Sequence, residues 1–259
     1  MQRRNFIKTA GVLAAVPALA TKPVVDNRTS TGAGEKEIYE CRIYTLNGEG
    51  DTLDAFFKET LIPAYSRQGV TVGVFKPYKP EEEAQRYLLF IYPNIATCLK
   101  TKNAVWDDRT FRNAAQAFFD ATAPQPAYSK FETILSEAFD KIPVHRQPGK
   151  ERTLFEFRVY QSPNEEANKR KVKMFNADEI AIFDQTGVNS VLYGDILAGP
   201  RQPALMYLTW YKDEPTRNEA WKQFGNHPDW KRISKLPEYA HTATNNKSTL
   251  LSPLAYSQL

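Results

Sequence analysis

The chain has 259 residues, a formal net charge of +4, two cysteines and three histidines. Three of its basic residues lie in the first 20 positions, which contain no acidic residue, so the rest of the chain has a net charge of 4 − 3 = +1. A nearly neutral protein lacks the basic surface that binds a nucleic-acid backbone, so we expect no nucleic-acid partner. The spacing of cysteines and histidines indicates no metal site, and no glycine-rich phosphate loop indicates a cofactor.

The first 20 residues have the pattern of a targeting segment. A twin arginine, Arg3-Arg4, precedes an apolar run over residues 9–19 that ends in a small-x-small cleavage site at Ala18-Leu19-Ala20. This order is typical of a twin-arginine export signal, and the apolar run is too short to anchor stably across a bilayer. An ordinary Sec signal and an uncleaved anchor are the alternatives. We therefore expect an exported, periplasmic protein with a disordered spacer over residues 21–36 and no later membrane span.

A repeat organises the remaining chain. Residues 39–44 and 155–160 share the pattern aromatic-Glu-x-Arg-x-Tyr, 155 − 39 = 116 positions apart. A helix candidate follows each segment and ends at Gln68-Gly69-Val70 in the first copy and at Thr186-Gly187-Val188 in the second. The same signals in the same order predict two copies of one structural unit.

Each copy is predicted to run strand, helix, strand, strand, helix, strand. Pro63 lies within the apolar stripe of the first helix and should kink it. A second helix over residues 95–121 is expected to break between Trp106 and Arg109. The remaining expected elements are strands at 39–44, 70–76, 87–92, 128–135, 155–160, 188–196, 205–211 and 248–251, and helices at 165–186 and from 216. The predicted modules are residues 37–140 and 151–259, joined by a linker over residues 141–150 that contains two prolines.

This order of elements predicts the fold class. A βαββαβ unit forms a four-stranded antiparallel sheet with helices on one face and an open second face. Two units in one chain can close their open faces against each other. We therefore expect an α+β fold in which two tandem ferredoxin-like modules form a pseudo-dimeric α+β barrel.

The residues that carry the repeat also resemble a known family. The opening segment from Tyr39 to Gly48, with its counterpart from Phe155, resembles the start of a NIPSNAP domain, and three later segments, at residues 228–231, 237–240 and 251–254, resemble its close. The resemblance implies the dimeric α+β barrel fold. The first copy departs more from the pattern, because Trp106-Asp107-Asp108 only loosely matches Pro228-Asp229-Trp230. The family carries no established reaction, so the resemblance implies a fold more than a function.

Side chains alternate along a strand, so each Glu-x-Arg-x-Tyr segment presents its polar residues on one face. These sets are Glu40, Arg42 and Tyr44 in the first copy and Glu156, Arg158 and Tyr160 in the second. If the apolar faces pack on the helices, the polar sets meet inside the barrel near its pseudo-twofold axis. One interpretation makes the arginines and tyrosines ligand-binding groups. The favoured one pairs Glu with Arg to lock the two halves together, because buried charges need partners.

Other candidate site residues lie in the second copy. His227 and Asp229, together with the phenol of Tyr207, are weak catalytic candidates, and the indoles of Trp210 and Trp230 are weak ligand-binding candidates. His227, Pro228 and Asp229 are also the residue types that begin a helix, with Trp230 packed inward, and this structural interpretation is favoured. Large aromatic residues more often belong to a core than to a ligand site.

Three functions are compatible with the sequence. The favoured one is binding of a small organic ligand in a cleft between sheet and helices, sought in the second module first. The alternatives are a cofactor-independent oxygenase or isomerase, by analogy with other α+β barrels, and a non-catalytic scaffolding protein of the envelope. The sequence leaves open the ligand, any reaction, homo-oligomerisation, and the redox state of Cys41 and Cys98, although a strand position favours a buried free thiol for Cys41.

Overall fold

The structure, a computed structural model, describes residues 35–79 and 82–259. The predicted export signal and residues 21–34 of the predicted spacer lie outside this range.

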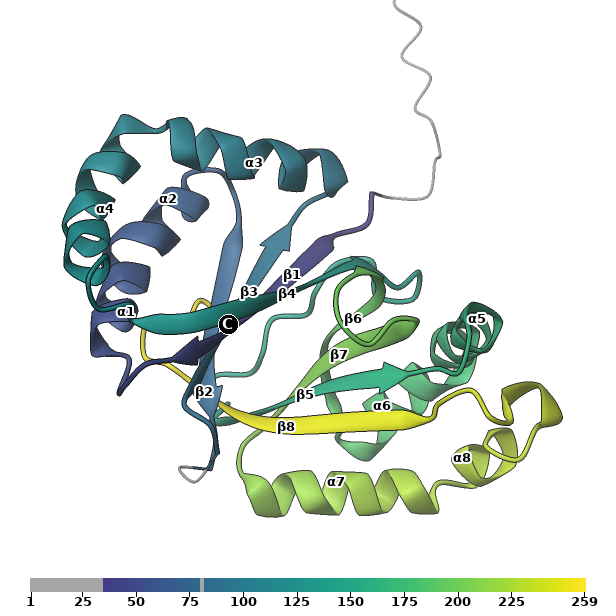
Figure 1. Cartoon of the computed structure of the whole chain (residues 1–259). Coiled ribbons are helices and arrows are strands. Elements are labelled where there is room, and N and C mark those ends of the chain that lie inside the picture. The colour runs from purple at the N-terminus through teal and green to yellow at the C-terminus, as the bar shows by residue number, and fades with distance from the viewer. Residues whose placement is uncertain (1–34, 80–81) are drawn as a thin grey trace, which may run out of the picture. The chain divides into compact units, whose positions relative to one another are not determined.

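Helices and strands follow the predicted order (Figure 1). The first module consists of β1 (Ile38–Leu46), α1 (Asp51–Phe56), the π-helical turn η1 (Phe57–Leu61), α2 (Ile62–Ser66), β2 (Thr71–Pro77), β3 (Gln85–Tyr92), α3 (Ile95–Asp107), α4 (Arg109–Thr122) and β4 (Tyr128–Ala138). The second module consists of β5 (Leu154–Gln161), α5 (Glu165–Met174), the π-helical turn η2 (Phe175–Glu179), α6 (Ile180–Thr186), β6 (Asn189–Ala198), β7 (Ala204–Tyr211), α7 (Glu214–Asn226), α8 (Pro228–Ile233), the 3-10 turn η3 (Pro237–Tyr239) and β8 (Asn245–Pro253).

The eight strands close into a barrel in the order β1-β3-β2-β8-β5-β7-β6-β4. Within this order each module contributes a ferredoxin-like sheet, β4-β1-β3-β2 or β8-β5-β7-β6, and every neighbouring pair is antiparallel. Two short ladders, β2 with β8 and β4 with β6, join the modules. The predicted pseudo-dimeric α+β barrel is therefore confirmed. The terminal strand β8 is longer than predicted because its two ends pair with different strands.

The two faces of the strands are used in the opposite way to the prediction. Apolar side chains such as Tyr39, Cys41 and Phe157 lie inside the barrel in one cluster with residues of both sheets. The polar set faces outward to the helices, where Glu40 contacts Lys102 of α3. The prediction that the polar sets meet inside the barrel is wrong. The interior cluster consists of strand side chains together with Leu259 of the C-terminal segment, whereas the helices supply counter-charges for a buried carboxylate.

Both modules contain a π-helical turn at the same place in the repeat, because η2 begins 175 − 57 = 118 residues after η1. The kink predicted at Pro63 takes this form: the helix widens in η1 and continues as α2, with Pro63 near its start. The turn η2 contains no proline, so proline is not required for the widening. The predicted break in the second helix is confirmed, with Asp108 as N-cap of α4 accepting a hydrogen bond from the Thr110 amide at 2.8 Å.

The two cysteines are buried and free. Cys41 faces the barrel interior, as its strand position predicts, and Cys98 packs from α3 into the cluster beneath the helices of the first module. Burial raises the pKa of the Cys41 thiol to about 12, so the thiol is protonated and unreactive at neutral pH.

Candidate functional site

A pocket of about 310 Å³ lies between the sheet of the first module and the helices that cover it. This volume falls in the usual range for small-molecule sites. Two of its lining residues are exposed to solvent, Trp106 at 54% and Phe131 at 44%. The lining consists of nine aromatic residues (Tyr44, Phe56, Phe57, Trp106, Phe111, Phe118, Phe119, Tyr128, Phe131), two leucines (Leu53, Leu61) and four polar residues (Glu40, Arg42, Lys102, Thr133).

The apolar wall forms because the aromatic residues of α4 share one helix face. Phe111, Phe118 and Phe119 are seven and eight positions apart, which places them on the same side of the helix. Phe118 stacks on Phe56 of α1 with a centroid separation of 4.1 Å, and Phe119 stacks on Trp106 at 5.8 Å. These stacked contacts, together with the edge contact of Trp106 on Phe111, build a wall of ring faces and edges.

A group of charged side chains forms the polar end of the pocket. Glu40 is 1% exposed and accepts hydrogen bonds from Arg42 Nε at 2.8 Å and from the Tyr92 hydroxyl at 2.8 Å. Lys102 Nζ lies 3.1 Å from the same carboxylate, and Arg42 Nη2 donates to the Tyr65 hydroxyl at 3.2 Å. One carboxylate thus faces two cations at this end.

The ionisation states follow from these contacts. Burial acts to raise the pKa of Glu40, but the charges and hydrogen bonds of Arg42, Lys102 and Tyr92 outweigh it and hold the pKa below its usual value. Burial also raises the pKa of the Tyr44 phenol to about 12. At neutral pH the polar end therefore holds a carboxylate from Glu40, a guanidinium from Arg42 and a neutral phenol from Tyr44.

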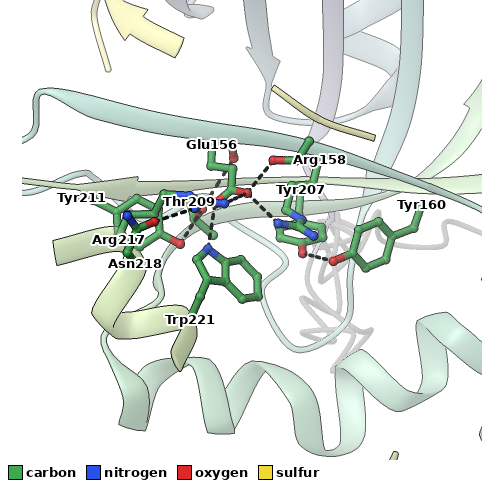
Figure 2. A network of polar contacts seen from close by, with 10 residues as sticks. Glu156, Arg158, Tyr160, Tyr207, Thr209, Tyr211, Arg217, Asn218 and Trp221 are labelled. Atoms are coloured by element: carbon green, nitrogen blue, oxygen red, sulfur yellow. Dashed lines mark hydrogen bonds and ion pairs between the residues drawn. The ribbon is translucent and has the colours of Figure 1, made fainter. Parts of the chain in front are cut away.

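The equivalent cleft of the second module is filled by side chains. Figure 2 shows Arg217 and Trp221 of α7 converging on Glu156, which is fully buried. Arg217 donates to both carboxylate oxygens at 2.7 and 2.8 Å, the Trp221 indole donates at 2.7 Å, and Arg158 donates at 2.5 Å. The Trp221 ring centroid lies 4.5 Å from the Arg158 guanidinium, so the indole covers the cation.

One substitution accounts for much of the difference between the two clefts. Helices α3 and α7 both have 13 residues and both begin after an Asx N-cap, so their positions correspond, and Lys102 and Trp221 are each the eighth residue. Both side chains contact the strand glutamate. A further difference lies on the central strand, where Leu88 is paired with Arg42 and Tyr207 with Arg158. The first module thus lacks an indole and a phenol that fill the second.

A buried ion pair also occupies the second cleft. Lys171 Nζ lies 2.8 Å from Glu179, and both side chains are less than a tenth exposed. Their counterparts 118 residues earlier, Leu53 and Leu61, line the pocket of the first module. Burial raises the pKa of Glu179, although the charge of Lys171 opposes the shift. The pair packs against other side chains and contributes to filling the second cleft.

The predicted ligand-binding residues fall in different places. Arg42 and Tyr44 line the pocket of the first module. Arg158 and Tyr160 belong to the filled cleft of the second module, where the buried Tyr207 hydroxyl donates to the Tyr160 hydroxyl at 2.7 Å. The structure therefore brings only the first pair to an open pocket.

The remaining predicted residues lie away from the pocket. His227 is the N-cap of α8 and accepts a hydrogen bond from the Asp229 amide at 3.3 Å. Trp230 packs on Phe224 with a centroid separation of 4.4 Å. Trp210 lies against Gly149, where a Cβ atom would come within 2.5 Å of the indole.

Several pocket residues were missed by reasoning from the sequence, chiefly Lys102, Trp106 and the phenylalanines of α1 and α4. Two signals were available. Aligning the helices of the repeat places Lys102 opposite Trp221, and α4 has 14 residues with phenylalanines on one face where α8 has six residues.

Family models identify two segments of the chain. Residues 155–258, which make up nearly all of the second module, match the NIPSNAP family model, and residues 1–20 match the twin-arginine translocation pathway signal sequence. These matches confirm the expected family resemblance and the expected export signal. Within the part of the chain that the structure describes, no helix is both long and apolar enough to span a membrane.

Solved structures with the same fold cover most of the chain. A candidate monooxygenase from Lactobacillus acidophilus is 11% identical, with a TM-score of 0.57, and the match covers 85% of this chain and 94% of that one. A candidate monooxygenase from Fusobacterium nucleatum is 14% identical, with a TM-score of 0.54 and coverages of 85% and 93%. An anthrone oxidase-like protein is 11% identical, with a TM-score of 0.53 and coverages of 86% and 93%. Such low identities show the fold alone. No curated protein matches the chain.

Proposed function

We propose that this exported protein with a NIPSNAP domain binds a small, largely aromatic organic molecule in the pocket of its first module. The observation that carries the proposal is the contrast between the two modules. The first has an open pocket of about 310 Å³ lined mainly by rings, while the equivalent cleft of the second is filled by Trp221 and its neighbours. Ligand sites are typically concave, mostly apolar and supplied with a few polar groups.

The composition of the wall favours an aromatic ligand. Phe56, Phe118 and Phe119 present ring faces and edges, and Trp106 extends the wall to the mouth. Ring pairs in stacked or edge contact stabilise a complex beyond the burial of area alone. A planar molecule of two or three fused rings can make such contacts with several of these side chains at once.

The proposal goes no further than binding. The neighbours that are named as candidate monooxygenases share only 11–14% of their residues with this chain, which supports a common fold and not a common reaction. A scaffolding role would draw on the exposed apolar residues of α3, Ile95 and Leu99. Those residues lie outside the pocket lining, so a scaffolding role would not explain why the first module has a pocket.

The proposal is tested with 2-naphthamide, an uncharged two-ring probe, and isothermal titration calorimetry. The exported protein should bind one equivalent, and Lys102→Trp, which places an indole where the second module has one, should abolish binding. Lys222→Trp, on the exposed face of α7, is the matched control and should bind like the unaltered protein. Thermal melting establishes that each variant is folded. Binding that survives in folded Lys102→Trp, or no binding by the unaltered protein, would contradict the proposal.

A further inference from the structure

We infer that the ligand of the first-module pocket is an aromatic acid, whose acidic group is bound by Arg42 and Lys102 and whose ring packs against the aromatic wall of the pocket. The inference rests on the proposed binding function and specifies its ligand class. It draws on the charge of the polar end, the unused donors of the two cations, and the arrangement of the equivalent side chains in the second module.

The polar end of the pocket carries an excess positive charge. Glu40 is the only acidic residue of the lining, whereas Arg42 and Lys102 are both basic. The remaining lining residues are uncharged and mostly apolar. In such surroundings an unbalanced cation attracts an anion more strongly than it does in water, because the local dielectric constant is low.

Both cations have donors to spare. A guanidinium has five N–H groups, and Arg42 uses one on Nε for Glu40 and one on Nη2 for Tyr65. The neighbouring Tyr44 phenol also interacts with the guanidinium, which still leaves N–H groups for a ligand. Among the residues that the structure describes, Lys102 pairs with Glu40 alone, and its ammonium has three N–H groups. A carboxylate can accept from both cations at once, in short charge-assisted hydrogen bonds.

Arg42 is held in place before any ligand binds. Its guanidinium lies 4.4 Å from the ring centroid of Phe90 and is anchored by hydrogen bonds to Glu40 and Tyr65. A planar guanidinium fixed in this way loses little conformational entropy when it binds an anion. The site is therefore arranged for an acidic group.

The second module indicates which space is left to the ligand. It has the same excess of charge, with Arg158 and Arg217 beside Glu156, but there Trp221 covers the guanidinium at 4.5 Å and donates to the carboxylate. In the first module Lys102 takes over the contact with the carboxylate, and Phe90 is the ring that lies against Arg42. The space that the indole occupies in the second module is left to the pocket. An aromatic acid that enters this space would balance the charge.

The test compares 2-naphthoate with 2-naphthamide, which has the same rings and no charge. By calorimetry the exported protein should bind 2-naphthoate at least about tenfold more tightly, as expected for charge-assisted hydrogen bonds in a partly buried site. Lys102→Met and Arg42→Gln should each remove most of this preference and leave the affinity for 2-naphthamide nearly unchanged. Lys222→Met is the control and should retain the preference. Lys102 is partly exposed, so Lys102→Met gives a folded variant that decides the question if Arg42→Gln unfolds.

The outcomes separate the inference from the proposed function. Equal affinities for the two probes, or a preference that persists in Lys102→Met, would overturn the assignment of an acidic ligand while binding in the pocket stands. Failure of both probes to bind would overturn the proposed function and the inference with it.

Discussion

Glu40 and Glu156 occupy equivalent strand positions but differ in what surrounds them. Glu156 is completely buried among donors from Arg217, Trp221, Arg158 and Ser248. Glu40 borders a pocket, and one of its partners, Lys102, reaches it from a partly exposed position. The same residue thus holds a filled cleft together in one module and forms one end of a site in the other.

This difference predicts unequal costs of neutralising the two carboxylates. Glu156→Gln leaves two cations without a counter-charge in a filled cleft and should lower the free energy of unfolding by about 3–5 kcal/mol. Glu40→Gln should cost clearly less, because the ammonium of Lys102 can turn to solvent. Urea denaturation of both variants at neutral pH measures the difference. Equal losses would show that the two sites are equally closed.

At the scale of residues, the sequence predicts which side chains share a face but not which face is inside. Period two correctly groups Glu40 with Arg42 and, on the opposite face, Tyr39 with Cys41. Both faces of these strands are buried, one against the second sheet and one against helices. A pattern of buried residues therefore does not tell which face lies inside the barrel. The counter-charges that decide the question come from Lys102 and its neighbours on helices, far away in sequence.

At the scale of elements, the end of the first helix in each module depends on glycine. Gly187 follows α6 with φ of 79°, a left-handed conformation that other residues adopt at a cost. A Cβ atom there would have room, its nearest neighbour being Ala220 Cβ at 3.7 Å, so only the backbone conformation opposes a side chain. The glycine signals that predicted these helix ends have this physical basis.

We therefore expect Gly187→Ala to lower the free energy of unfolding by about 1 kcal/mol or more. Gly225→Ala is the control, because Gly225 lies within α7 with nothing near the position of its Cβ and should gain about 0.5 kcal/mol from better helix propensity. Thermal and urea unfolding of the two variants give the comparison. A loss at Gly225 as large as that at Gly187 would contradict the conformational explanation.

Most elements of the fold were predictable, but the pocket was not. The pattern places α3, the break before Asp108 and α4 where the structure has them, because caps and apolar stripes are local signals. The pocket depends on how β1, β4 and three helices pack together, which no single segment encodes. Its traces in the sequence are Lys102 at the position of Trp221 and the phenylalanines of α4 where α8 is short, and only comparison of the two copies reveals them.

At the scale of the whole molecule, the barrel interior joins the modules into one core. Phe75 of β2 meets Phe155 of β5 at a centroid separation of 4.8 Å, and Tyr87 of β3 meets Phe157 of β5 at 6.1 Å. The order of elements predicts this closure, because two open sheet faces must cover each other. Neither sheet can keep its inner face buried without the other.

A destabilised barrel interior should therefore affect both modules equally. Leu208→Ala removes a buried side chain of β7 and should cost about 2–5 kcal/mol. Hydrogen exchange followed by mass spectrometry should show the same loss of protection in peptides from β1 and from β5, because the two strands open in one cooperative unit. Loss of protection in β5 alone would mean that the modules unfold independently.

The central claim is that the open site lies in the first module and that its ligand replaces the indole present in the second. A crystal structure of the exported protein with 2-naphthoate tests it most directly. We predict that the rings lie between α4 and β1, against the phenylalanines of the pocket wall, with the carboxylate within hydrogen-bond distance of Arg42 and Lys102 and with the second cleft unchanged. Density for the probe beside Trp221, in the barrel mouth or on the surface, with the first-module pocket empty, would contradict the claim.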